Sequence, residues 1–383
     1  MAHESGSAFD NFMETLSEES AQDAAALQDD VSFLLSANAS NLVRREMEYN
    51  DPEKQFVRGE WLRYAGELNK RLGRQLSYLT LPAYYRIDVT MMLEKDFLAK
   101  RRENGRDVLK VAAFETDPTK FARMRVLSPE FRVFGNCRLE DAMTDPKNIY
   151  HDDLRRMFPF DMINFDLTTS LTPQHEGPYS RVMQALEEVM KRQASSYDEW
   201  VLFLTFRNSE AEWEQTALNV FIDNLQSNLD QWPSVRDKFV GKLQVNNAKA
   251  LQKKDPSSAI IQSVAKWLVD RGHTYGIGCE KIDSYRYQRY SEGLDPYTIS
   301  KLLMRFKRGP RTQAIIPTKA TVRETWMETD LVRCIEQNKH KDIEALLLDR
   351  DGRLETIAAE TERLIGVFNA LFTNGNEAPA ASG

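Results

Sequence analysis

Three short apolar segments between residues 107 and 173 constrain the fold more than any other part of the sequence. They are predicted strands at Val108–Phe114, Phe131–Cys137 and Asp161–Leu167, and each is followed by acidic or small polar residues. Short apolar strands separated by helical or polar segments predict a parallel α/β sheet. The carboxyl ends of parallel strands meet at one edge of the sheet, where open α/β folds bind ligands. We therefore expect a ligand site at this edge.

Acidic residues follow each of the three predicted strands. Glu115 and Asp117 follow the first strand, Glu140 and Asp141 follow the second, and Asp166 lies at the end of the third. Each carboxylate also has a purely structural interpretation, because such residues often cap helices, and Asp117 directly precedes a proline. The repetition over three strands, rather than any single residue, favours a pocket.

The three segments also resemble a known family. FETDP, NCRLED and FDMINFDLTT are similar, in order and spacing, to the second-, third- and fourth-strand motifs of class I S-adenosylmethionine-dependent methyltransferases. The resemblance spans about residues 76–308. It implies a Rossmann-like α/β fold with a mostly parallel seven-stranded sheet, an antiparallel closing strand, and helical N- and C-terminal extensions.

The resemblance implies S-adenosylmethionine as cofactor. Glu115 or Asp117 is then expected to bind the ribose hydroxyls, and Glu140 or Asp141 to lie near the adenine. Asp166 is expected to be the catalytic residue at the methyl-transfer centre. The residues implied for cofactor binding are Pro82, Ala83, Asp88, Glu115, Asp117, Glu140, Asp141 and Phe165.

The first strand-to-helix turn departs from this family. Leu76–Pro82 is a predicted strand and residues 85–100 a predicted helix, which together form the first βαβ unit. A cofactor-binding methyltransferase usually has a glycine-rich turn here, because glycine lets the backbone approach the ligand. This chain has LTLPAYYRID, with no glycine between Leu76 and Gly105, and Pro82 lacks a backbone donor.

Two interpretations of this turn remain open. In one, Tyr84 and Tyr85 fill the pocket and cofactor binding has been lost. In the other, Ala83 leaves enough room, the tyrosines form a wall, and Asp88 or Arg86 makes polar contacts. The sequence therefore leaves open whether the chain is an enzyme.

Further strand and helix patterns follow the acidic segments. Trp200–Phe206 is a continuous apolar run that predicts a buried strand, and Ser209 with Glu212 predicts a capping box for the next helix. Residues 230–258 are polar and are expected to be an irregular insertion. Residues 273–308 predict the antiparallel pair that completes the sheet.

This predicted pair of strands is rich in aromatic and basic residues. Interleaved rings and cations are typical of surfaces that stack on bases and neutralise phosphates. An edge strand kept soluble by Lys and Arg is the competing interpretation, and we favour it. The candidate nucleic-acid-binding residues are Arg286, Arg289, Arg305, Lys307 and Arg308.

Composition divides the chain into four parts. Residues 1–50 form an acidic, partly disordered arm or helix, and residues 51–315 form the methyltransferase-like domain. Residues 316–374 predict a helical extension with a short heptad pattern, followed by a disordered tail at 375–383. The C-terminal helix is expected to pack on the chain's own core, and a protein partner or a homodimer bound through the arm or this helix is the alternative.

The remaining composition excludes several classes of protein. The net charge of −7 gives no global tendency to bind nucleic acid. Three widely spaced cysteines fit neither a disulfide framework nor a zinc site, and no metal is expected. No apolar run approaches the roughly 20 residues that span a bilayer, so a cytoplasmic protein without a membrane partner is expected.

Three functional hypotheses follow. The first is a methyltransferase of unknown acceptor. The second is a non-catalytic relative that acts as a scaffold or partner subunit in a bacterial multiprotein system. The third is a nucleic-acid-binding module. A fold by itself implies no activity, so the sequence does not decide among them.

Overall fold

The structure is a computed structural model. It describes residues 52–82, 86–103, 105–127, 131–196, 198–289, 297–308, 319–338, 340–343, 346, 359, 361–363 and 365–366. The predicted acidic arm and C-terminal tail lie outside the described residues, as does most of the predicted heptad segment.

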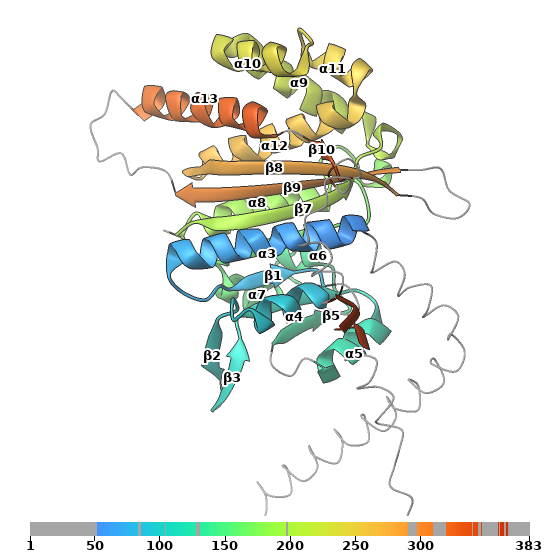
Figure 1. The fold of residues 1–383 in the computed structure, drawn as a ribbon, viewed down its shortest axis with the longest axis vertical. Coiled ribbons are helices and arrows are strands. Elements are labelled where there is room, and N and C mark those ends of the chain that lie inside the picture. The colour runs from blue at the N-terminus through green and yellow to red at the C-terminus, as the bar shows by residue number, and fades with distance from the viewer. Residues whose placement is uncertain are drawn as a thin grey trace, which may run out of the picture. The chain divides into compact units, whose positions relative to one another are not determined.

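An eight-stranded sheet in the order β10-β8-β9-β7-β6-β1-β4-β5 forms the centre of the fold (Figure 1). The strands are β1 (Tyr78–Thr80), β4 (Val111–Glu115), β5 (Arg132–Gly135), β6 (Met162–Asp166), β7 (Trp200–Arg207), β8 (Ile277–Arg289), β9 (Tyr297–Arg308) and β10 (Lys341–Asp342). Only β9 runs antiparallel to its neighbours in this sheet, β7 and β8. The predicted mostly parallel α/β sheet is confirmed.

The predicted strand count and the place of the antiparallel strand differ in detail. β10 adds an eighth strand, because two residues of the segment predicted to be helical pair with Tyr285 and Arg286 of β8. β9 lies between β7 and β8 rather than at the edge of the sheet. The sequence could not show β10, since a two-residue strand has no periodic pattern.

The strand order creates a reversal in the middle of the sheet. From β1 the chain moves outward through β4 to β5, and then returns to place β6 on the other side of β1. Open α/β sheets bind ligands at such a switch point, outside the carboxyl ends of the strands. We call this side of the sheet, where β1, β4, β6 and β7 end, the carboxyl edge.

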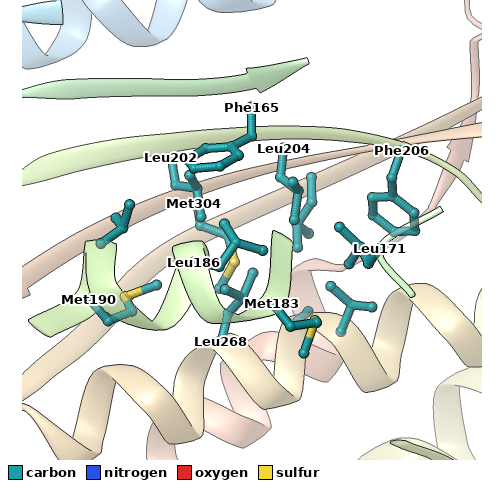
Figure 2. Packing of buried hydrophobic residues seen from close by; sticks show 14 of the residues in the cluster. Phe165, Leu171, Met183, Leu186, Met190, Leu202, Leu204, Phe206, Leu268 and Met304 are labelled. Atoms are coloured by element: carbon teal, nitrogen blue, oxygen red, sulfur yellow. The ribbon is translucent and has the colours of Figure 1, made fainter. Parts of the chain in front are cut away.

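Helices cover both faces of the sheet (Figure 1). They are α3 (Pro52–Leu72), α4 (Ile87–Glu94), α5 (Pro118–Leu127), α6 (Leu139–Thr144), α7 (His151–Met157), α8 (Arg181–Gln193), α9 (Gln215–Gln231), α10 (Pro233–Leu243), α11 (Ala248–Lys254), α12 (Pro256–Thr274) and α13 (Lys319–Gln337). Trp61 and Tyr64 of α3 pack on Phe203 of β7 on one face. On the other face, Met183 and Leu186 of α8 belong to a cluster with the sheet and α12 (Figure 2).

Four local predictions are wrong. The predicted strand at Val108–Phe114 is split, because Lys110 donates its N–H to Ala99 and leaves β3 (Arg106–Leu109) in a separate hairpin with β2 (Lys100–Glu103). The predicted helix at 85–100 ends at Glu94, because the chain then forms β2 of this hairpin.

The other two errors lie near α9. The segment 230–258 is not irregular, because a proline in the first turn of α10 and the Asn247 cap of α11 start two helices there. The predicted capping box is a 3₁₀ turn, Glu210–Glu212, and Ser209 makes no cap. The carboxylate of Glu214 caps α9 instead, and it accepts the N–H of Ala217 at 2.6 Å.

Side chains of α13 cover part of the exposed edge of β8. Asp330 accepts the N–H of Cys279 at 2.7 Å, Arg333 donates to the Cys279 carbonyl, and Gln337 accepts the N–H of Ile282 at 2.9 Å. Unpaired strand edges favour aggregation, and these contacts satisfy backbone groups that would otherwise be open. The start of the predicted C-terminal extension is therefore an integral part of the fold.

Candidate functional site

Polar side chains gather at the carboxyl edge on the face that α3 covers. Residues alternate between faces along a strand, so Asn164 and Asp166 of β6 lie on this face, together with Tyr78 of β1. Thr80 is in register with Asn164, and Thr205 of β7 is in register with Asp166. The switch point thus has a polar surface within an otherwise apolar sheet.

Asp88 is the centre of a buried hydrogen-bond network beside β1. Its Oδ2 accepts the Tyr78 hydroxyl at 2.8 Å and the Thr80 hydroxyl at 3.0 Å. Burial raises the pKa of the Asp88 carboxyl, although both hydrogen bonds oppose this shift. Asn164 donates to the Tyr78 oxygen at 3.2 Å, while its own Oδ1 has no partner among the described residues. A buried acceptor without a donor requires an explanation, and a bound water or ligand is one.

Asp166 forms an ion pair with Lys301 of β9. The carboxylate oxygen lies 3.5 Å from Lys301 Nζ, which also donates to the Thr205 hydroxyl at 3.0 Å. Burial would raise the pKa of Asp166, but the Lys301 charge and the Thr205 hydrogen bond outweigh it, so this pKa is lowered. The Lys301 side chain is 5% exposed and that of Asp166 is 37% exposed, so the carboxylate is the accessible member of the pair.

Glu115 and Asp117 lie at the end of β4, as predicted. Glu115 accepts the N–H of Asp117 at 2.9 Å, and Asp117 accepts the N–H of Lys120 at 3.1 Å. Asp117 therefore caps α5, which is the structural role considered for it. Glu115 uses one oxygen in the turn, and its half-buried side chain remains at the carboxyl edge.

Glu140 and Asp141 lie in the first turn of α6, which packs on α8. Burial raises the pKa of the Glu140 carboxyl. Asp141 forms an ion pair with Arg181 of α8. No contact joins either residue to Glu115 or Asp166 among the described residues, so their place beside an adenine stays a prediction.

Phe165 was expected at the cofactor site, but its side chain lies in the core. It is fully buried on the opposite face from Asp166, toward α8, because adjacent strand residues point in opposite directions (Figure 2). Pro82 is buried at the end of β1. Ala83, Tyr84 and Tyr85 lie outside the described residues.

Sequence reasoning missed several residues at the edge. They are Tyr78, Thr80, Asn164, Thr205 and Lys301. The available signal was a polar residue inside an apolar strand, as in MINFD, VLFLTF and ISKLLM. Such residues are expensive to bury without partners, which makes them candidates for a site.

The basic block on β8 and β9 is largely neutralised. Arg286 lies 3.0 Å from Asp255 and 3.4 Å from Asp342, whereas Arg305 and Lys307 lie 3.7 and 3.8 Å from Glu199. Arg289 and Arg308 also have interaction partners. The rings of Tyr285 and Tyr287 are buried and cannot stack on bases in this arrangement. These contacts argue against the nucleic-acid interpretation of the block, although β9 is an interior strand rather than an edge strand.

Comparison with known proteins gives a family. A family model described as PP_RS20740-like matches residues 119–373, about two thirds of the chain. The chain belongs to the PP_RS20740-like family. No curated protein matches it. Among the described helices of this family member, none is long and apolar enough to cross a membrane.

Solved structures give only distant similarity. One is a Burkholderia thailandensis 1,6-didemethyltoxoflavin-N1-methyltransferase with S-adenosylhomocysteine, at 12% identity and a TM-score of 0.29, covering 76% of this chain and 90% of that one. Another is human methyltransferase-like protein 13 with SAH, at 12% identity and a TM-score of 0.26, covering 78% and 97%. Scores this low support no inference, so the fold assignment rests on the strand order and the switch point.

Proposed function

We propose that this PP_RS20740-like protein binds S-adenosylmethionine at the carboxyl edge and transfers its methyl group to an acceptor. The observation that carries the proposal is the ionised, accessible carboxylate of Asp166 at the switch point, paired with a buried lysine. An ion pair with one buried member, here Lys301 at 5% exposed, is costly to maintain for stability alone. Its position where open α/β folds bind ligands supports a functional role.

The residues present fit this cofactor in part. Glu115 lies at the end of the strand next to β1, and its second carboxylate oxygen would accept hydrogen bonds from the ribose hydroxyls. The buried Oδ1 of Asn164 offers an acceptor that the protein itself leaves unsatisfied. Glu140 is proposed beside the adenine, whereas Asp141 is already paired with Arg181.

Asp166 would act on the acceptor. S-adenosylmethionine supplies an electrophilic methyl group bound to a sulfonium. Because Lys301 lowers the pKa of Asp166, its carboxylate is a weak base at neutral pH, and it would orient an acceptor N–H or O–H rather than remove that proton in advance. Lys301 and Thr205 would hold the carboxylate in place.

A non-catalytic scaffold is the second candidate. The observation in its favour is Pro82, which removes a backbone donor from the turn where this class of cofactor is usually bound. The Asp88 network also satisfies Tyr78 and Thr80 internally, without a ligand.

Calorimetric titration with S-adenosylmethionine separates the two candidates. We expect saturable binding that Glu115→Ala weakens about tenfold to hundredfold, the range for losing hydrogen bonds to a charged group. Asp152→Ala is the control, because this carboxylate is exposed on α7 and its ion pair among the described residues is with Arg155 of the same helix. Absence of binding at millimolar ligand, or equal loss in both variants, would refute cofactor binding at this edge.

A further inference from the structure

The hairpin formed by β2 and β3 is separate from the main sheet. The two strands pair antiparallel, from Lys100 with Leu109 to Glu103 with Arg106, and Gly105 has a φ of +79° in the turn. They form a two-stranded sheet of their own, which projects away from the body of the domain (Figure 1). Buried Leu98 and Leu109 anchor its base in the core.

This hairpin carries a charge opposite to that of the whole chain. Residues 100–110, which we call the basic hairpin, contain five cations and two acids, a net charge of +3, whereas the chain has a net charge of −7. The cations are Lys100, Arg101, Arg102, Arg106 and Lys110. Positive charge is thus concentrated on a projecting element of an acidic protein.

Most of these cations are not neutralised. Arg101 pairs with Glu103 at 2.6 Å. Within the part of the chain that the structure describes, the four others form no ion pair with a carboxylate, and all four are exposed. The basic block of β8 and β9 differs, since its cations lie against Asp255, Asp342 and Glu199. The nucleic-acid-binding residues predicted from the sequence lie in that neutralised block and not in the basic hairpin.

We propose that the basic hairpin binds the phosphate backbone of duplex DNA. A two-stranded β-ribbon is an element that fits the major groove, and flanking Arg and Lys side chains neutralise phosphates there. Exposed cations of this kind bind by releasing counterions, so a protein of negative net charge can still bind through one local patch. An anionic membrane fits less well, because the tip of the hairpin has no exposed apolar side chain to insert.

The basic hairpin is distinct from the carboxyl edge. Lys110 directly precedes β4, so the hairpin lies at the amino end of that strand, while Glu115 lies at its carboxyl end. The proposal therefore stands or fails independently of cofactor binding. The basic hairpin lies outside the acidic motifs quoted from the sequence and outside residues 119–373, which the family model matches.

Fluorescence anisotropy with a labelled duplex of about 20 base pairs tests the proposal, over a salt range of about 50 to 200 mM. The test variant is Arg102→Glu with Arg106→Glu. The matched control is Arg155→Glu with Arg156→Glu on α7, which makes the same change in net charge at two exposed arginines. Thermal melting of both variants checks that the fold is retained.

The test variant should lose roughly 60-fold in affinity at about 0.1 M salt, because each lost phosphate contact removes about 8-fold. Its plot of log affinity against log salt should become shallower by about 1.8, while the control keeps the slope of the unmodified protein. Equal loss in both variants, or no binding by the unmodified protein, would overturn the proposal. So would hairpin-dependent binding to phosphatidylserine vesicles without binding to DNA.

Discussion

Acid should destabilise the fold through His340. This side chain is 5% exposed, and its ring nitrogens lie 2.9 Å from the Ser300 hydroxyl and 3.3 Å from the Ser258 hydroxyl. Burial lowers its pKa to about 3, helped by the charge of Arg286 and opposed by that of Asp255. As the pH falls below 6.5, His340 therefore becomes protonated in the unfolded chain while it stays neutral in the folded protein.

The sign and size of the effect follow from this shift. Below the ordinary pKa of 6.5, the unfolded chain binds a proton that the folded chain refuses, so stability falls as the pH falls from 6.5 toward 3. When the pH is lowered from 7.5 to 5, a group with these two pKa values reduces the free energy of unfolding by about 2 kcal/mol. Above about pH 7.5 His340 contributes no further pH dependence.

Urea unfolding followed by tryptophan fluorescence measures the effect. His340→Gln keeps a neutral polar side chain that does not titrate. The free energy of unfolding of this variant should therefore fall by about 2 kcal/mol less, between pH 7.5 and pH 5, than that of the unmodified protein. Carboxyl groups titrate in both proteins and cancel in this difference. His175→Gln is the control, because the His175 side chain is 78% exposed. An equal pH dependence in His340→Gln and the unmodified protein would refute the reasoning.

Three further substitutions test the packing around the sheet. Gly135→Ala should destabilise the fold by about 1–3 kcal/mol in urea unfolding, because the new methyl group would overlap the Phe121 ring. Gly241→Ala has open space around the new methyl group, and should stabilise the fold by up to about 1 kcal/mol through helix propensity; a loss at this position would contradict that view. Ser180→Ala should cost about 1 kcal/mol, because its hydroxyl caps α8 by accepting the N–H of Met183 at 3.2 Å, and an unchanged midpoint would show that the cap contributes little.

Local patterns in the sequence were sufficient for the fold class. Short and continuous apolar runs predicted β5, β6 and β7, because burial of a strand leaves a mark in nearby residues. The carboxylates after successive strands were correctly placed at strand ends for the same reason. Glu115 and Asp166 lie there in the structure.

The same patterns failed where a backbone contact comes from elsewhere in the chain. The apolar segment around Val108 looked like one strand, yet its first half pairs with β2 in the basic hairpin. Asp117 caps α5 by a local contact with Lys120, as its structural interpretation allowed, and its contact with a ligand stays a prediction. The family resemblance implied Phe165 at the cofactor site, although the alternation along β6 places its side chain in the core.

The sequence by itself determined a parallel α/β sheet and carboxylates at the ends of its strands, because each depends on residues close together in the chain. Only the tertiary structure decided which of these carboxylates has a partner. Asp166 and Lys301 are 135 positions apart and meet because β9 inserts antiparallel beside β7. The same long-range pairing neutralises the cations of β8 and β9 and leaves those of the basic hairpin exposed. The electrostatics of both proposed sites therefore depend on strand order, which local periodicity does not encode.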